Sequence, residues 1–489
     1  MTKDVGILTI YHKTTHMLLH RIHPSFDVVV RPVPNAKLDV VFISSIVDLT
    51  RVEDRLLKPL THISIKRIPN LSVWLNDTLH LASIKRASTV DEALQALLDN
   101  SAVLCCSNEY FVVGVQGLTR RTPEEPATEV AIRGPRDGFT ESIDTNISLL
   151  RTRMKNPDLT FDKFVIGERS KTTVLLTYIR DLANADLVQE ATNRLRQVKI
   201  DGLLDAGILE QWIEDNHWSP YPQIQATERP DKVAAALLEG RLAFFVDGTP
   251  FVLLAPAVFI SFFQTSDDYT QRWWSGTALR TIRLIALFVS IFIPSFYIAL
   301  TMFNPELMPL NMTLQLAATR EGIPLPIVME AITMEVMVEL VREAGNRMPQ
   351  QMGQSYTIVG GLVIGDIAVQ AGIVSPIMVV AVGLTALGAF AIPNYEAALV
   401  TRMIRFPMLI ATSLFGIIGT LGFALIFLAH LSTLKSFGVP YLTPFGQLSL
   451  PDLKDTFARP PVQVTTLRPA AYLSPRSWLG RARYRAKKD

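Results

Sequence analysis

Charged side chains interrupt an otherwise apolar stretch, LPIVMEAITMEVMVELVREAGNRM, which runs from Leu325 to Met348. Its glutamates, with the arginine beside them, are the candidate residues, in the order Glu330, Glu335, Glu339, Arg342 and Glu343. At about 100° per residue on a helix, the last four share one face. Ionisable groups at membrane depth are costly and usually face a bundle interior, a partner or water. This face is therefore a candidate lining or coupling element of an ion path. An interfacial amphipathic helix, or an Arg–Glu pair with no wider role, would explain the same pattern.

A further carboxylate and several glycines lie in the apolar runs that follow. Asp366 stands inside IVGGLVIGDIAV, with apolar residues on both sides. It is a second candidate for the ion path, unless it lies at a helix end. Gly361 and Gly365 form a GxxxG pair, and Gly419 lies in the last apolar run. Because glycines spaced in this way let helix backbones approach closely, we expect tight helix packing within the chain or between copies.

The residue patterns of common enzyme and metal sites are absent from the sequence. It contains no Walker loop, GxSxG elbow, HExxH motif or Cys/His metal box. The two cysteines, Cys105 and Cys106, are adjacent, which suits neither a structural disulfide nor a metal site and favours a reducing compartment. A net charge of +2 gives no general attraction to nucleic acid. We therefore expect no catalytic, cofactor-binding or metal-binding residues, no enzyme activity and no nucleic-acid partner.

Long apolar runs predict an all-α polytopic membrane domain over residues 251–435, with four or more membrane-embedded helices. Trp273 and Trp274, followed by Arg280 and Arg283, precede the first run and are typical of a cytoplasmic interfacial anchor. Arg402 and Arg405 are expected to mark another cytoplasmic end. Residues 436–489 form a basic tail. If the N-terminal region and this tail are both cytoplasmic, the number of crossings is even. The clear apolar runs are Leu284–Phe303, Tyr356–Ala371, Ile373–Ile392 and Met408–His430.

The N-terminal half predicts a cytoplasmic α/β region built from two related βα subdomains, 1–130 and 131–250. The stretches that begin at Lys37 and Asp91 can be laid over those that begin at Lys171 and Asp231, in the same order and at similar spacing. Each copy has a β-branched run, a turn, an amphipathic helix, and then a second helix and a strand pair.

Several strings, in their order along the chain, resemble the GerA family of spore germination proteins, specifically the A-subunit type of nutrient germinant receptor. They cover about residues 130–460 and include RGPRDGFTESIDTN from Arg133, TERPDKVAAALLEGR from Thr227, FFQTSDDY from Phe262, MEVMVELVREAGNRMP from Met334 and HLSTLKSFGVPYLTP from His430. The chain departs from the A-subunit pattern at Asp366, where that pattern has Gln after VIG. The related SpoVA-operon protein tolerates such variation.

The resemblance implies a multi-pass subunit of the spore inner membrane that triggers germination in response to nutrients. It implies two partners, a membrane-embedded B-type subunit that binds the nutrient and a C-type lipoprotein, and a homo-oligomeric cation channel in the lipid bilayer. Acidic side chains that face water would attract cations there. The alternatives are a non-conducting scaffold that relays the signal, and the SpoVA-associated paralogue that amplifies ion release. A secondary transporter would need inverted repeats in the membrane half, which the sequence does not display.

Overall fold

A computed structural model gives the fold in two compact units, each described here by itself. One unit comprises Met1–His217, Ile224–Pro256 and Thr466–Asp489, and the other comprises Trp218–Gln223 and Ala257–Thr465. The residues that the structure describes are 12–23, 25–34, 38–61, 84–106, 109–115, 125–347, 362–446, 456, 458–461, 463, 468–472 and 474–475.

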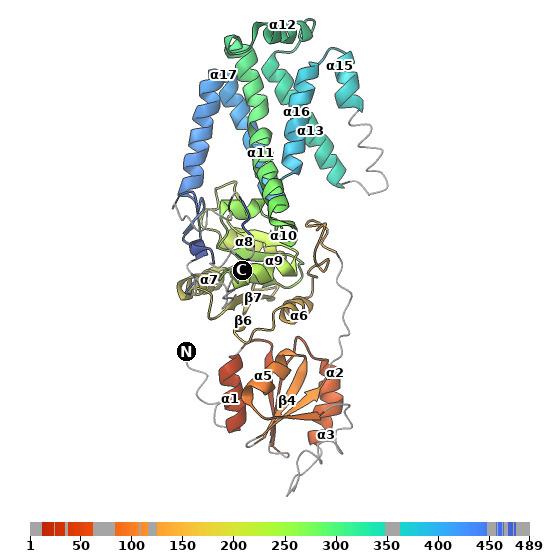
Figure 1. Ribbon diagram of the computed structural model, residues 1–489, viewed down its shortest axis with the longest axis vertical. Coiled ribbons are helices and arrows are strands. Elements are labelled where there is room, and N and C mark those ends of the chain that lie inside the picture. The colour runs from red at the N-terminus through yellow and green to blue at the C-terminus, as the bar shows by residue number, and fades with distance from the viewer. Residues whose placement is uncertain are drawn as a thin grey trace, which may run out of the picture. The chain divides into compact units, whose positions relative to one another are not determined.

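The first unit begins with a five-stranded antiparallel sheet that has helices on both faces (Figure 1). The strand order is β1-β2-β4-β5-β3. Alternate residues of a strand point to opposite faces. In β2, Val40 therefore joins the core beneath η2 and α3, while Val41 joins the core beneath α1 and α5. The elements are α1 (Lys13–Ile22), β1 (Val28–Val33), β2 (Leu38–Ile43), α2 (Leu49–Arg51), η2 (Val52–Leu57), α3 (Lys58–Thr61), β3 (Ile84–Ala87), α5 (Val90–Leu98), β4 (Ser101–Cys105) and β5 (Tyr110–Gly114).

A second five-stranded antiparallel sheet repeats this topology, with the strand order β6-β7-β9-β10-β8. Counted along each copy, both orders are first, second, fourth, fifth and third, which confirms the duplication predicted from the sequence. Within each copy, the neighbouring strands pair antiparallel. This is the arrangement of a sheet whose strands are connected by hairpins. The elements are α6 (Ile143–Arg153), β6 (Leu159–Ile166), β7 (Thr172–Ile179), α7 (Ala185–Gln197), α8 (Ala206–Ile213), β8 (Gln225–Thr227), α9 (Pro230–Leu238), β9 (Leu242–Val246) and β10 (Val252–Ala255).

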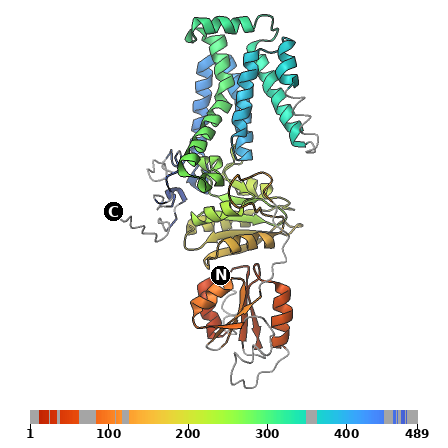
Figure 2. The ribbon, with the colours of Figure 1, turned by 45° about the vertical axis from the view of Figure 1, so that its right-hand side comes forward.

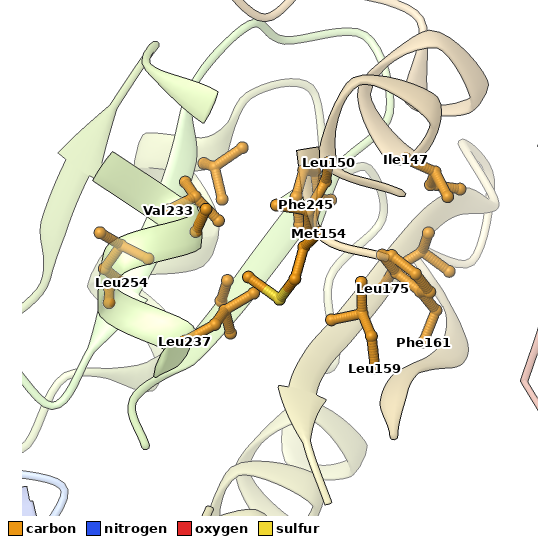
Figure 3. Packing of buried hydrophobic residues seen from close by; sticks show 14 of the residues in the cluster. Ile147, Leu150, Met154, Leu159, Phe161, Leu175, Val233, Leu237, Phe245 and Leu254 are labelled. Atoms are coloured by element: carbon orange, nitrogen blue, oxygen red, sulfur yellow. The ribbon is translucent and has the colours of Figure 1, made fainter. Parts of the chain in front are cut away.

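The core of the second copy lies between its sheet and the helices α6 and α9 (Figure 3). Leu150 and Met154, at the end of α6, meet Leu237 of α9 above Leu175 and Phe245 of the sheet. All five side chains are buried. The expected domain boundary at residue 250 precedes β10, which belongs to this sheet.

The second unit is mainly helical, and two of its helices are long and apolar enough to cross a membrane: Trp273–Phe303, which is α11 with η4, and α17. Only 39% and 22% of their most apolar windows are buried in the protein, which is less than is usual for the core helices of a soluble fold. The elements are η3 (Phe259–Phe263), α10 (Ser266–Thr270), α11 (Trp273–Ile298), η4 (Ala299–Phe303), η5 (Pro305–Leu307), α12 (Leu310–Thr319), α13 (Ile327–Arg347), η6 (Leu362–Ile367), α15 (Ala368–Gln370), α16 (Pro376–Phe390), α17 (Tyr395–Thr433), β11 (Lys435–Ser436) and β12 (Val439–Pro440). The 3-10 helix η7 (Ala470–Tyr472) belongs to the first unit.

The long helix α17 is two helical limbs joined at Gly416. Gly416 has φ 59° and ψ −140°, a backbone conformation that is not helical and that glycine adopts without a steric penalty. Ala397 near the start of α17 and Leu431 near its end pack in one hydrophobic cluster, so the second limb returns toward the start of the first. The predicted apolar run Met408–His430 therefore straddles the bend.

Candidate functional site

Two of the carboxylates singled out in α13, Glu335 and Glu339, lie in a charge cluster between α13, α16 and α17. Glu335 and Arg405 form an ion pair, and both side chains are 1% exposed. The Thr385 hydroxyl of α16 lies 3.3 Å from Glu335 Oε1 and accepts a hydrogen bond of 3.2 Å from Arg405 Nη1. A buried charge requires such a partner, because desolvation of an isolated ion is prohibitive.

The cluster continues along α13 through a second glutamate. Arg342 donates to Glu339 at 2.7 Å, and Arg402 of α17 approaches the other Glu339 oxygen at 3.8 Å. Arg342 also lies over the Phe390 ring, with 4.8 Å between the guanidinium carbon and the ring centroid. Three guanidinium groups therefore share two carboxylates in this cluster. The expected cytoplasmic end markers, Arg402 and Arg405, are instead part of the helix bundle's interior.

Glu330, near the start of α13, connects two other segments of the unit. One of its oxygens accepts from both the backbone N–H and the hydroxyl of Ser375 at 2.6 Å, and Ser375 caps α16. The other oxygen accepts from Arg320 at 2.5 Å. With its carboxylate fully buried and satisfied, Glu330 joins the loop after α12 to the start of α16.

The other predicted site residues lie outside this interior. Glu343 is exposed and pairs with Arg347 one helical turn away. Asp366 is exposed in η6. A Cβ at Gly365 would meet no described atom within 4 Å, so none of the helices that the structure describes packs closely there. A Cβ at Gly419 would collide with the Ala411 backbone, because the two limbs of α17 approach closely there. Gly361 lies outside the described residues.

The start of α11 is held by one buried carboxylate rather than by free basic anchors. Asp268 forms a capping box with Thr265 and accepts from Arg283 at 2.8 Å, and Arg280 lies 3.5 Å away. The string FFQTSDDY, one of those that carry the family resemblance, thus pairs with the arginines expected at the membrane interface.

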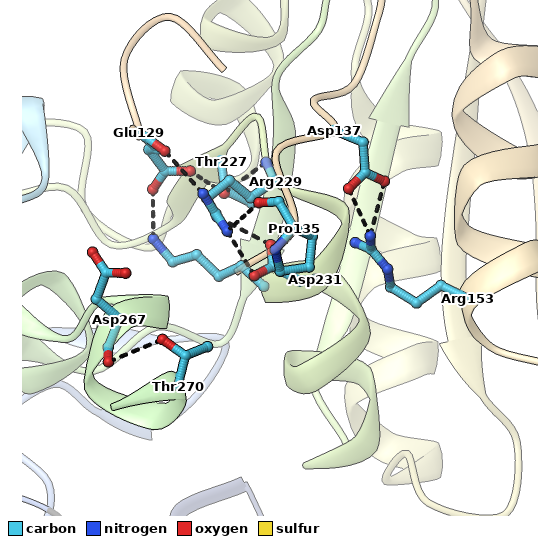
Figure 4. A network of polar contacts seen from close by, with 10 residues as sticks. Glu129, Pro135, Asp137, Arg153, Thr227, Arg229, Asp231, Asp267 and Thr270 are labelled. Carbon is cyan, nitrogen blue, oxygen red and sulfur yellow. Dashed lines mark hydrogen bonds and ion pairs between the residues drawn. The ribbon is translucent and has the colours of Figure 1, made fainter. Parts of the chain in front are cut away.

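A second polar network brings together two more of these strings in the first unit (Figure 4). Arg229, beside the start of α9, donates to Asp231 and to the backbone oxygens of Glu129 and Pro135. Lys232 pairs with the Glu129 carboxylate at 2.7 Å. The segment before α6 folds over the start of α9, so the strings RGPRDGF and TERPDK interact. The network therefore gives both strings a structural role.

Sequence reasoning found the carboxylates of α13 but missed their partners. Thr385, Arg320 and Ser375 stand in loops or apolar helices without any unusual local pattern. Arg402 and Arg405 offered a signal, since a spacing of three places them on one helix face that could oppose the acidic face of α13. Among the described residues, no group of three or more His, Cys, Asp or Glu side chains could hold a metal ion.

The fold and the cluster define a class of protein: a duplicated α/β region followed by a helical region whose apolar helices suit a lipid bilayer. The family model "Bacillus/Clostridium GerA spore germination protein" matches residues 16–471. The chain belongs to the GerA spore germination family.

Three relatives match over more than four fifths of their own length. The chain is 40% identical to "Spore germination protein KA" of Bacillus subtilis (strain 168) over 91% of this chain and 83% of that one. It is also 40% identical to "Uncharacterized membrane protein YfkQ" of the same organism, over 88% of this chain and 85% of that one. "Spore germination protein GerLA" of Bacillus cereus is 37% identical over 88% of each. A solved structure, the N-terminal domain of the A subunit of the Bacillus megaterium spore germinant receptor GerK3, is 34% identical, with a TM-score of 0.39, over 50% of this chain and 94% of that one.

Proposed function

We propose that this chain is the A-type subunit of a spore germinant receptor and that several copies together form a cation channel. Family membership supports the first part. The observation that carries the second is the charged helix α13. It places ion-paired Glu335 inside a bundle of apolar helices and leaves Glu343, like Asp366 of η6, on an exposed surface. Charges at such depth are characteristic of ion pathways.

The proposal places the chain in the spore inner membrane, with the α/β region and the basic tail in the cytoplasm. An even number of crossings, with α11, α13, α16 and each limb of α17 among them, would put the α/β region and the tail on the same side. The partners are a B-type nutrient-binding subunit and a C-type lipoprotein, in addition to further copies of this chain. The proposed role includes no catalytic step.

The candidate carboxylates differ in burial, and this difference decides which of them make a clean test of the proposal. Glu335 and Glu330 are buried and paired. Removal of the Glu335 charge would leave the buried Arg405 without its carboxylate, and removal of the Glu330 charge would do the same to Arg320, which is 17% exposed. Such a loss costs about 3–5 kcal/mol. The ion flux of a Glu335→Gln variant therefore reports folding as well as conduction. The exposed pair, Glu343 and Asp366, gives the cleaner test.

The experiment is K⁺ flux through the purified chain in liposomes, in which wild type is compared with Asp366→Asn and Glu343→Gln. If these carboxylates attract the passing cation, the loss of about 1.4 kcal/mol of attraction slows flux about tenfold. Glu306→Gln, at an exposed carboxylate of η5, is the matched control and should conduct like wild type.

A wild-type leak that neither substitution changes would remove these residues from the path. No leak at all from a folded, inserted chain would favour a signal-relaying scaffold, with the duplicated α/β region as its contact surface. Co-reconstitution with the B-type and C-type subunits then distinguishes a scaffold from a channel that needs its partners. The SpoVA-associated paralogue is distinguished in spores, where loss of that protein would slow ion release after any nutrient.

A further inference from the structure

The charge cluster of α13, α16 and α17 contains more hydrogen-bond donors and more positive charge than its own residues satisfy. Among the described residues, five guanidinium nitrogens of the cluster are buried without an acceptor: Nε and Nη2 of Arg342, Nε of Arg402, and Nε and Nη2 of Arg405. The three side chains are at least nine-tenths buried, with exposures of 9%, 7% and 1%.

The three arginines form one group rather than three separate sites. Glu335 and Glu339, the two carboxylates that the arginines contact, lie one helical turn apart on α13. Arg342 and Arg402 share Glu339, while Arg405 takes Glu335. Three positive charges against two negative ones leave one net positive charge in a low-dielectric interior. Like charges repel strongly there unless another negative charge is present.

We propose that this cluster binds one small monovalent anion of the chloride class among Arg342, Arg402 and Arg405. Water could accept hydrogen bonds from the free nitrogens, but only an anion would also neutralise the remaining charge. The nitrogens lie inside the helix bundle with almost no accessible surface, which suits a compact dissolved ion better than a lipid headgroup. The site does not include Glu343 or Asp366, the carboxylates that test cation conduction, and its occupant would join α13 to α17.

Thermal unfolding of the purified full chain in neutral detergent tests the proposal. Chloride replaces gluconate at constant sodium concentration and constant ionic strength. A ligand that binds only the folded state raises the midpoint temperature by mass action. We expect a saturable rise of about 2–8 °C in wild type.

Arg402→Gln is the informative variant, because Glu339 keeps Arg342 as its partner while the cluster becomes neutral. The saturable chloride effect should then disappear. Glu339→Gln changes the cluster in the opposite sense, to two net positive charges, and should lower the chloride concentration at half-saturation. Arg347→Gln removes an exposed arginine of the same helix and should respond like wild type.

The proposal is overturned if the response to chloride is absent, or if it is linear and equal in wild type and Arg402→Gln, since either outcome leaves water as the acceptor. It is also overturned if stabilisation requires anionic lipid in the detergent micelle and chloride has no effect, because the acceptor would then be a headgroup. If Arg402→Gln does not fold, Glu339→Gln alone tests the proposal. A chloride concentration at half-saturation that is the same in Glu339→Gln and in wild type would then contradict the site.

Discussion

At the scale of single residues, buried ion pairs in this chain differ in how completely they are satisfied. Asp27 and Arg151 lie in the first and second α/β copies and are 1% exposed. Arg151 donates to both Asp27 oxygens, at 2.8 and 2.9 Å, and Ser25 and Ser45 complete the carboxylate's contacts. The two copies are therefore joined by a bidentate pair with no free carboxylate oxygen.

The Asp27–Arg151 pair predicts strong destabilisation when one partner is removed. Arg151→Met should reduce the free energy of unfolding of the first unit by about 3–5 kcal/mol, because Asp27 remains buried without a counter-charge. Urea unfolding of the full chain, followed by pulse proteolysis, measures this change.

Removal of both charges supplies the control for that prediction. The double variant Asp27→Leu with Arg151→Met should regain much of the lost stability, since apolar replacements of a buried pair are often neutral. An exposed pair, Arg86–Glu109, should contribute about 0–1 kcal/mol when treated in the same way. Equal losses at the two pairs would mean that burial of Asp27 is not what makes its pair important.

At the scale of elements, the bend in α17 determines how many helical limbs the second unit has. A Cβ placed on Gly416 would lie 2.8 Å from the Phe303 ring, so both the backbone conformation and the space require glycine. Thr412 and Thr420, on opposite sides of the bend, share a hydrogen bond of 2.8 Å that holds the limbs together.

Gly416→Ala should therefore destabilise the helical unit. The positive φ alone costs about 1–3 kcal/mol for a residue with a Cβ, and contact with Phe303 adds to that value. Gly422→Ala is the matched control, because Gly422 lies in the second limb and a Cβ there meets nothing within 4 Å. Melting temperatures in detergent compare the two. A tolerated Gly416→Ala would argue for a straight α17.

The bend also marks the limit of what the sequence could predict. The duplicated sheets were predictable because the strands carry their own apolar pattern and some helices start after a polar cap, such as Thr89 before α5 and Asn184 before α7. The carboxylates of α13 were predictable because charge is conspicuous in an apolar helix. Gly416 resembles the other glycines of its run, and only the contact with Phe303, far away in sequence, distinguishes it. The partners of Glu335 depend on tertiary packing in the same way.

At the scale of the whole molecule, the proposed membrane topology follows from the path of the chain through the second unit. Phe303, the last residue of η4, lies against the Gly416 bend. The helix α12 follows and lies at the end of the helical unit that is far from the start of α11 (Figure 2). The hydrophobic cluster that contains Phe263, which precedes α11, also contains two residues of α17. These are Ile404 in the first limb and Leu431 near the end of the second. The loop after α12 and the end of α17 are therefore at opposite ends of this unit.

Thiol labelling can test that arrangement in the intact chain, because the native cysteines should stay silent. Burial raises the pKa of both Cys105 and Cys106 to about 12, and the thiolate is the species that reacts. Near pH 7 almost no thiolate forms, and labelling of the native pair should require unfolding or a pH near that pKa. A cysteine introduced at an exposed position would then give the only fast signal.

The prediction uses two exposed sites, Glu321→Cys after α12 and Thr433→Cys at the end of α17. In sealed right-side-out vesicles, a membrane-impermeant maleimide should label Glu321→Cys at once and Thr433→Cys only after permeabilisation. The unsubstituted chain is the control and should remain unlabelled in both conditions. Labelling of both sites from outside would place the two ends of the unit on one side of the membrane. That result would contradict a crossing by α11 and the return of α17, and with them the even number of crossings that puts the α/β region and the tail in one compartment.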